Sequence, residues 1–388
     1  MSEWKEYRLG EIAQIQTGPF GSQLHMSDYK KIGTPIVTVE HLGENKIIHN
    51  NLPLVGNDDK ERLIKYTLQE GDIVFSRVGS VDRRAYVTNK ENGWLFSGRC
   101  LRVRPHKLHS NSKFLSFYFG QKDFKENIRR IAVGATMPSI NTTILSEINI
   151  FLPPLSEQRA IASILTSLDD KIDLLHRQNA TLEKMAETLF RQWFVEEAKE
   201  EWEMGKLGDE FDFTMGQSPP GESYNENGVG IPMYQGNADF GFRFPTNRIF
   251  TTDPKRFAEK FDTLISVRAP VGAQNMANER CCIGRGVAAF RYIFNESYYS
   301  YVYYKMKSLI DEITQFNETG TVFGSISKSD FEAIEIIIPD SESIESFQKF
   351  ANPIDEKIKS NQSQIRTLTQ LRDTLLPKLM SGEVRVEC

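Results

Sequence analysis

An internal repeat constrains the fold most, because the second half of the chain follows the first landmark by landmark. The separation is 198 residues between Trp4 and Trp202 and 186 residues between Pro153 and Pro339, a change that loops within each copy absorb. The shared landmarks are mostly Gly, Ser, Trp and Pro in one order: Trp4, Leu9, Gly10, Gly18, Asp72, Ser76, Gly98, Arg99 and Pro153, repeated as Trp202, Leu207, Gly208, Gly216, Asp262, Ser266, Gly284, Arg285 and Pro339. These matches indicate a tandem duplication.

Each copy begins with a part of mixed character. Short strand-like runs at 34–39, 72–76, 100–103 and 263–267 are broken by Gly, Pro and Asn, and an aromatic-rich helical stretch follows. This pattern predicts an α+β fold for two globular domains, at 1–153 and 200–339. A chain of 388 residues is long enough for both domains to have cores of their own.

Each copy ends in a long helical segment, at 154–199 and again at 340–388. The pattern predicts helices over 156–195 and 341–381, with Ser156 and Asp340 as N-caps and Gly382 as the stop of the second helix.

Apolar residues recur at alternating steps of three and four along both helices, which is typical of a coiled coil. The predicted seam consists of Leu165, Leu168, Ile172, Leu175, Asn179 and Leu182 in the first helix and Ile354, Ile358, Asn361, Ile365 and Leu368 in the second. Asn179 and Asn361 interrupt the apolar stripe, as residues that fix register do.

The direction of the helices follows from their order in the chain. The first helix, about 60 Å long at 1.5 Å per residue, delivers the chain to the second domain, so the second helix buries its stripe on the first only by running back. The sequence therefore predicts two related domains separated by two long antiparallel coiled-coil helices, with approximate twofold symmetry. Two amphipathic helices, each lying on its own domain, are the alternative.

The overall net charge of −5 conceals opposite balances in the two domains. Residues 1–153 carry 21 Lys and Arg against 16 Asp and Glu, a net charge of +5. Residues 200–340 carry 13 against 21, a net charge of −8. The first domain can therefore attract phosphates through charge alone, whereas the second needs clustered cations to do so.

Signatures of catalysis, metal binding and membrane insertion are missing from the sequence. It contains no phosphate-binding loop, dinucleotide fingerprint, nucleophile elbow or zinc-protease motif. The four cysteines and six histidines lack metal-ligand spacing. No stretch approaches the ~18 apolar residues of a membrane span, and the N-terminus does not read as a secretory signal. We therefore expect a cytoplasmic protein that acts by recognition and not by catalysis.

The segment PPLSEQRAIASILTSLDDKIDLLHRQNATLEKMAETLFRQWF, at 153–194, resembles the central conserved helix of specificity subunits of type I restriction-modification enzymes. The stretches IQTGPFGS, GDIVFSRVGS and VGATMPSIN in the preceding domain are similar to the same family. The resemblance covers essentially the whole chain. The second copy departs from it, because it keeps Pro339 and residues 355–358 but loses the Glu-Gln step at the start of the helix.

The resemblance implies that each domain is a target-recognition domain that reads one half of a bipartite sequence in double-stranded DNA. The helices would set the spacing and dock two adenine-N6 DNA methyltransferase subunits, and ATP-dependent endonuclease/translocase subunits would complete the complex for phage defence. S-adenosylmethionine, ATP and Mg²⁺ would belong to these partners. This chain would bind no cofactor and no membrane.

Polar and basic residues of predicted loops are the candidate DNA contacts. They are Thr17, Gly18, Gly21, Ser22, Arg77, Ser80, Arg83, Arg84, Ser139, Asn141 and Thr142 in the first domain and Gly216, Gln217, Ser218 and Arg268 in the second. Backbone N–H groups of a glycine-rich loop can hold phosphate, and an arginine just past a strand end can reach guanine or phosphate. Ordinary tight turns, solvated arginines and helix caps are the competing interpretations.

The aromatic clusters Phe114/Phe117/Tyr118 and the tyrosines of 298–304 are expected in cores and not in base stacking. Trp193 and Phe194 fit a protein-docking patch and packing against the second domain equally well. Two other functions stay open. One is a scaffold whose domains bind only proteins, which the acidic second domain favours, and the other is the specificity subunit of a fused methylase-nuclease.

Overall fold

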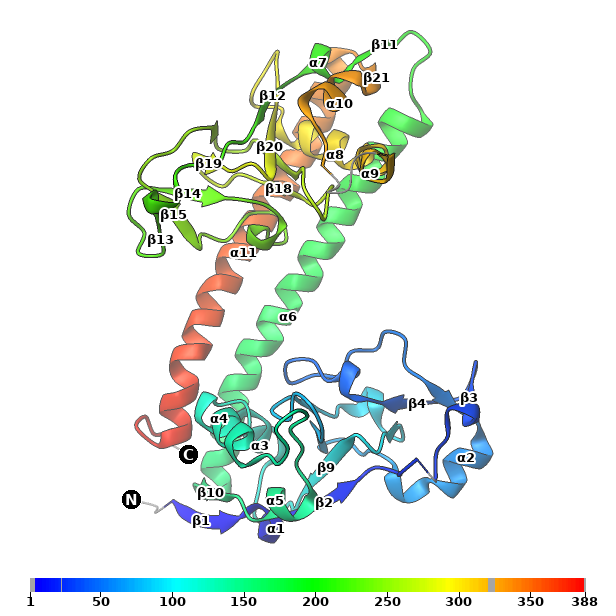
Figure 1. Ribbon diagram of the computed structural model, residues 1–388, viewed down its shortest axis with the longest axis vertical. Helices are drawn as coiled ribbons and strands as arrows, with labels where there is room; N and C mark the ends of the chain where they lie inside the picture. Colours follow the sequence, from blue (N-terminus) through cyan, green and yellow to red (C-terminus); the bar gives the residue numbers. More distant parts are fainter. Residues whose placement is uncertain (1–3, 22, 320–324, 387–388) are drawn as a thin grey trace. The chain divides into compact units, whose positions relative to one another are not determined.

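The computed structural model describes residues 4–21, 23–319 and 325–386 and divides into two compact units (Figure 1). The first unit comprises residues 1–172 and 367–388, and the second comprises residues 173–366. Both boundaries fall inside long helices, so each unit holds one globular domain and a part of each helix.

The first domain is built on two four-stranded sheets, with strand orders β2-β9-β6-β7 and β3-β5-β4-β8, and a separate antiparallel pair, β1-β10. The strands are β1 Lys5–Arg8, β2 Ala13–Thr17, β3 Tyr29–Lys30, β4 Thr34–Val37, β5 Leu54–Val55, β6 Ile73–Ser76, β7 Arg84–Tyr86, β8 Leu95–Phe96, β9 Cys100–Pro105 and β10 Asn149–Leu152. The helices are α1 Leu9–Ile12, α2 Asn57–Arg62, α3 Ser112–Tyr118, α4 Lys122–Ile131 and α5 Thr142–Ser146.

The second domain repeats this topology, with sheets β12-β20-β17-β18 and β13-β15-β14-β19-β16 and the pair β11-β21. The strands are β11 Glu203–Lys206, β12 Phe211–Met215, β13 Tyr224–Asn225, β14 Ile231–Tyr234, β15 Ile249–Thr251, β16 Phe257–Ala258, β17 Thr263–Ser266, β18 Gln274–Met276, β19 Cys281–Ile283, β20 Val287–Tyr292 and β21 Glu335–Ile338. The helices are α7 Leu207–Glu210, α8 Tyr299–Ser308, α9 Ile310–Thr319 and α10 Lys328–Ala333. The predicted α+β fold of two duplicated domains is confirmed.

The two long helices are α6 Leu155–Arg191, which continues into a π-helical turn at Gln192–Glu196, and α11 Ser341–Ser381. Asp340 caps α11 as predicted, accepting the N–H of Ser343 at 2.8 Å, and Gly382 follows the helix with a φ of +76°. The N-cap predicted at Ser156 is wrong. The carbonyl of Pro154 accepts the first helical hydrogen bond, from the N–H of Gln158, so α6 begins one residue earlier and Ser156 lies inside it.

The helices run antiparallel within each unit. In the first unit, Asp169 of α6 pairs with Arg372 of α11 at 2.9 Å. In the second, the amide of Asn361 donates a hydrogen bond of 2.9 Å to Asn179. Residues early in one helix thus meet residues late in the other. Of the predicted seam, six residues are buried and five half-buried: Leu165, Leu175, Asn179, Ile354, Ile358 and Asn361, then Leu168, Ile172, Leu182, Ile365 and Leu368.

A buried glutamine joins each long helix to the aromatic-rich helix of its own domain. Gln158 accepts the N–H of Asn111, the N-cap of α3, at 2.8 Å and donates to the carbonyls of His109 and Pro153. Gln348 of α11 accepts the N–H groups of Ser300 and Tyr301 in α8. Because the sequence motif around Gln158 is absent from the second copy, the same anchoring is achieved there by a residue one helical turn later.

The core of the second domain encloses a carboxyl group. Glu210 is fully buried at the end of α7, where its Oε1 accepts the hydroxyl of Tyr301 at 2.7 Å and its Oε2 has no partner among the described residues. Burial raises the pKa of Glu210 to about 7, against a weaker opposing effect of Lys305. Burial also lowers the pKa of Lys305, so burial shifts both groups toward their neutral forms.

We expect this carboxyl group to make stability depend on pH. Its pKa is higher in the folded chain than the unfolded value of 4.5, so its favourable contribution is complete below about pH 4.5 and is lost as pH rises through about 7. Glu210→Gln keeps an acceptor for Tyr301 and removes the charge. Its gain in free energy of unfolding over the parent chain should be larger at pH 8 than at pH 5, by up to about 3 kcal/mol. Urea unfolding at both pH values measures this, and parallel pH profiles of the two proteins would contradict it.

Candidate nucleic-acid interface

The predicted contact residues occupy the same topological position in both domains. In the first, the loop after β2 lies beside the start of β9, where Gly18 donates its N–H to Cys100 at 3.2 Å, and the N–H of Arg77 binds the carbonyl of Arg99 at 2.8 Å. In the second, Gly216 donates to Val287 at 2.9 Å in the equivalent arrangement. The loop after β2, the loop before β9 and the loop after β6 therefore converge at one end of the sheet β2-β9-β6-β7. The equivalent loops lie at the same end of the sheet β12-β20-β17-β18.

The glycines of these loops serve close backbone packing. A Cβ at Gly18 would lie 2.2 Å from the carbonyl oxygen of Ser97, and one at Gly216 would lie 2.1 Å from that of Gly284. Their N–H groups, like that of Gln217, already bind strand carbonyls. The proposed phosphate cradle of backbone N–H groups at Gly18, Gly216 and Gln217 is therefore wrong, because sheet hydrogen bonds consume those donors.

Other residues of the loop differ in accessibility. Thr17 ends β2 and is half-buried, whereas Gly21 is exposed with nothing within 4 Å of a Cβ placed on it. Ser22 lies outside the described residues. Phe20 is 55% exposed, and the guanidinium of Arg77 lies 5.4 Å from the centre of its ring. An exposed aromatic ring and a half-buried cation thus lie together at this point.

Arg77 is half-buried and held in place. Its Nη1 donates to the carbonyl of Gly98 at 3.1 Å, and its own carbonyl accepts the N–H of Ile140. These bonds fix the guanidinium beside the loop that precedes β9. Ser80, farther along the same segment, is exposed.

Arg84 is removed from the set of accessible cations, which corrects its assignment as a DNA contact. Only 4% of it is exposed, and it donates to the carbonyl of Ser116 and to Glu44 at 2.9 Å each. Burial lowers the pKa of Arg84, and Glu44 opposes that shift. Arg83 is half-buried and donates to the carbonyl of Leu42. Both side chains thus support the domain internally.

The segment before α5 borders Arg77. Ser139 forms bridges with Val78 and Val133, and its hydroxyl donates to the carbonyl of Val133 at 3.1 Å. Asn141 caps α5 by accepting the N–H of Ile144 at 2.8 Å, as the competing interpretation held, while the side chain as a whole is exposed. Thr142, the first residue of α5, is half-buried.

In the second domain, the corresponding place is a polar pocket. Ser218, Gln235, Asn237, Arg268 and Arg285 line it, together with Gly236, Ala269 and Gly286. The hydroxyl of Ser218 accepts both the N–H and the Nε–H of Arg285 at 3.3 Å. Arg268 and the neighbouring Gln217 are exposed. Every lining residue is neutral or basic, although the domain as a whole is acidic, so the local charge opposes the net charge.

Sequence reasoning missed Arg99 and Arg285. Both are exposed, and both follow the glycine that leads into β9 or β20. The repeat itself carried the signal, because Gly98-Arg99 matches Gly284-Arg285. Gln235 and Asn237 were also missed, and no local pattern distinguishes them from other polar loop residues.

The aromatic residues lie in cores, as expected. Phe114 and Phe117 are buried in the first domain, and Tyr301, Tyr303 and Tyr304 are buried in the second. Of the two interpretations of Trp193 and Phe194, the structure favours packing within the second unit over an exposed protein-docking patch. Phe194 is buried in the core of the second unit and the half-buried Trp193 packs against that core, and both rings contact Phe347 of α11.

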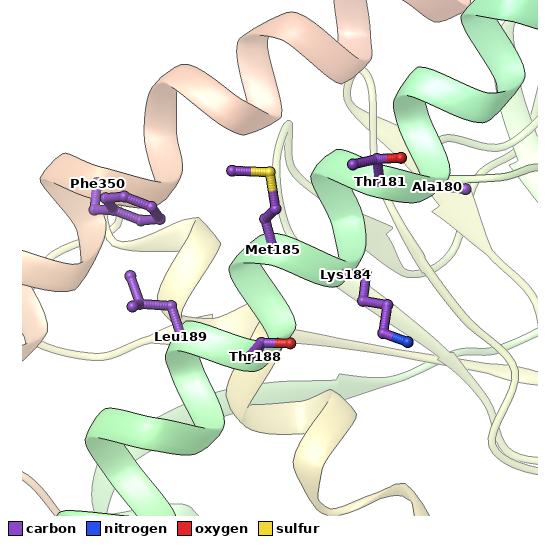
Figure 2. Close-up of a pocket in the computed structure, with 7 residues that line it drawn as sticks. All are labelled: Ala180, Thr181, Lys184, Met185, Thr188, Leu189 and Phe350. Carbon is purple, nitrogen blue, oxygen red and sulfur yellow. The ribbon is translucent and has the colours of Figure 1, made fainter.

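A shallow apolar groove lies on the two long helices in the second unit (Figure 2). Its lining is Ala180, Thr181, Lys184, Met185, Thr188 and Leu189 of α6 and Phe350 of α11. Met185 is 51% and Phe350 42% exposed, so two large apolar side chains face outward side by side. Exposed apolar surface of this kind is typical of protein contacts.

No helix in the described ranges is long and apolar enough to cross a membrane. Across the same ranges, no group of three or more His, Cys, Asp or Glu side chains is placed to hold a metal ion.

Comparisons with known proteins agree along almost the whole chain. The model of the type I restriction modification DNA specificity domain matches residues 1–184 and 199–371. The type I restriction enzyme MjaX specificity subunit of Methanocaldococcus jannaschii is 32% identical over 408 residues, covering 99% of this chain and 94% of that protein. The HindI specificity subunit of Haemophilus influenzae is 24% identical over 478 residues, covering 99% and 100%. The crystal structure of the S subunit of a type I system from M. genitalium has the same fold, with a TM-score of 0.68 at 19% identity over 97% of this chain and 96% of that one.

The close packing at Gly216 is open to a direct test. Gly216→Ala should lower the free energy of unfolding by about 2–3 kcal/mol, because the added methyl group overlaps the backbone of the loop before β20. Gly221→Ala is the matched control, since nothing lies within 4 Å of a Cβ there, and we expect it to change stability by less than about 0.5 kcal/mol. Urea unfolding that gave equal effects for the two variants would show that the loop accommodates a side chain.

Proposed function

Since the chain belongs to the type I restriction-modification DNA specificity family and is a specificity subunit with two target-recognition domains, we propose that each domain reads one half of a bipartite target through the loop cluster described above. The observation that carries this proposal is the recurrence of one Gly-Arg pair, at Arg99 and Arg285, in the same loop of both domains. We take 1–153 and 200–339 as the reading domains and 154–199 and 340–388 as the spacer segments.

The chemistry of the two loop clusters suits base and phosphate contacts. Arginine binds guanine or phosphate through paired N–H groups, and the amides of Gln and Asn match adenine. Arg268 and Arg285 supply the first kind of group, and Gln235 and Asn237 supply the second. Because charges beyond about 8 Å are screened at physiological salt, the basic pocket can approach DNA despite the net charge of −8 that residues 200–340 carry.

The apolar groove on the long helices is the surface we assign to a methyltransferase subunit. Burying Met185 and Phe350 removes apolar surface from water, which favours association. In this proposal two methyltransferase subunits dock on the helices, and endonuclease/translocase subunits complete the complex in the cytoplasm. The chain itself is non-catalytic, and the partner subunits bind S-adenosylmethionine, ATP and Mg²⁺.

Arginine substitutions test the reading surfaces. The complex with methyltransferase subunits is tested on a duplex that carries the target sequence found by mapping methylated bases. If the arginines read a base, Arg99→Ala and Arg285→Ala should each weaken binding by about 1–3 kcal/mol. If they bind phosphate, each substitution should reduce the slope of log affinity against log salt concentration by about 1. Arg280→Ala removes an exposed cation paired with Glu259 elsewhere in the second domain, and its affinity should stay within about twofold. Equal affinities of all three variants and the parent chain would contradict the assignment.

A deletion tests whether the length of the helices sets the length of the unread segment between the two half-sites. Removing residues 172–178 from α6 and 362–368 from α11 takes one heptad from each helix and preserves the pairs Asp169–Arg372 and Asn179–Asn361. The loss of about 10 Å of helix should shorten the unread segment of the target by about three base pairs and leave both half-sites unchanged. Sequencing of modified bases in cells that carry the variant measures both.

The control for the deletion is a substitution of Asp173 and Arg177 by Ala, which removes an exposed pair without changing helix length. If the deletion variant keeps the same length of unread segment, or reads new bases in a half-site, the helices do not set the spacing of the target.

A further inference from the structure

The second domain holds a fully buried arginine outside the proposed DNA-reading pocket. Arg243 lies in the segment between β14 and β15, and none of its surface is exposed. Its guanidinium pairs with Asp355 of α11 at 2.5 Å and with Glu183 of α6, and it donates to the hydroxyl of Tyr304 at 2.7 Å. One side chain of the domain thus binds both long helices at once.

The cluster contains further charged groups. Lys307 of α8 joins it by pairing with Glu183 at 2.6 Å and with the more exposed Glu187 at 3.7 Å, so two cations meet three carboxylates. The guanidinium also lies 3.9 Å from the centre of the Tyr303 ring. The Tyr303 and Tyr304 rings cover the fully buried guanidinium, and its ion pairs are held because water does not compete for the cation.

The backbone that carries Arg243 leads directly to the reading pocket. Gln235 and Asn237 line the pocket, and Asp239 holds the N–H of Gln235 at 2.8 Å. The carbonyl of Arg243, four residues later, accepts the N–H of Met276 in β18 at 2.8 Å. The segment from Gln235 to Arg243 therefore joins pocket, sheet and helices.

The ion cluster is a second attachment point, separate from the apolar one. Phe190 and Phe347 pack the helices against the aromatic core of the domain. Glu183 precedes Phe190 by seven residues, and Asp355 follows Phe347 by eight, so the two attachments lie about 10 Å apart along each helix. A body fixed at one place can pivot about it, whereas fixing it at two places removes that freedom.

The first unit uses the corresponding carboxylate differently. The repeat relates Asp169 to Asp355, at the same separation of 186 residues as Pro153 and Pro339. Asp169 pairs directly with Arg372 of α11, and its charge also acts on the buried Arg84 of the first domain. Among the described residues, a domain arginine that pairs directly with both long helices is thus found in the second copy.

Resting on the function proposed above, we propose that Arg243 is a positioning residue that fixes the angle of the second domain on the helix pair and so restricts the complex to one length of unread DNA. For a domain about 30 Å across, a tilt of about 7° moves its far edge by about 3.4 Å, the rise of one base pair. Loss of the second attachment should therefore admit targets one base pair longer or shorter.

The test measures binding of the complex with methyltransferase subunits to duplexes that carry both half-sites at the natural spacing and at one and two base pairs more or fewer. Two variants are compared with the parent chain. Arg243→Gln removes the cation alone. The triple variant, Arg243→Met with Glu183→Gln and Asp355→Asn, removes the cation and both of its carboxylate partners, so no buried charge of these pairs is left unpaired to unfold the domain. Arg291→Gln is the matched control, because Arg291 pairs with the buried Asp262 inside the domain and contacts neither helix in these pairs.

We expect both Arg243 variants to keep affinity for the natural spacing within about fivefold and to lose at least tenfold in preference over the neighbouring spacings, while Arg291→Gln keeps the parent preference. An unchanged preference in the triple variant would overturn the proposal. Loss of binding to every duplex by the folded triple variant would also overturn it, because Arg243 would then act on binding and not on spacing. If the parent chain itself shows no bipartite target, the proposed function fails instead.

Discussion

Burial of the apolar stripes of α6 and α11 is the constraint on which the rest of the structure depends. Each helix supplies core residues to both units, with Ile161 and Leu165 of α6 in the core of the first and Ala186 and Phe190 in that of the second. Neither domain therefore has a complete core without both helices. Loss of one domain from such a chain would expose the faces of α6 and α11 that its core covers.

The sequence allowed prediction of those features that repeat or follow a period. The duplication, the two long helices, their antiparallel seam and the cap at Asp340 all depend on residues near one another in the chain or on a regular spacing. The predicted start of α6 was one residue late. The carbonyl of Pro154 accepts the first hydrogen bond of the helix, so the helix begins at Leu155, before Ser156. Such errors are local and leave the fold unchanged.

Features that depend on distant partners could not be predicted from the sequence. Arg84 looked like an exposed cation after a strand, but its guanidinium binds the buried carbonyl of Ser116, 32 residues later. Arg243 meets Asp355 across 112 residues of sequence, and no spacing rule connects them. The loop glycines illustrate the same limit, since their pattern suggests an open cradle, whereas the backbone of another loop fills the space. Arg99 and Arg285 were predictable in principle, because the repeat preserves them while most neighbouring residues change.

The polar pair within the seam shows how register and recognition are connected. Asn179 and Asn361 bind each other in the interior of the second unit, and one polar atom of each, Nδ2 of Asn179 and Oδ1 of Asn361, is left without a partner among the described residues. A slip of one helix along the other would separate the two amides and bury each against apolar side chains, which costs more than the existing pair. The same slip would part Glu183 from Asp355 and pull the two carboxylates off Arg243. The asparagines thus fix the register, the register brings the carboxylates together, and the carboxylates hold the segment that leads to the reading pocket.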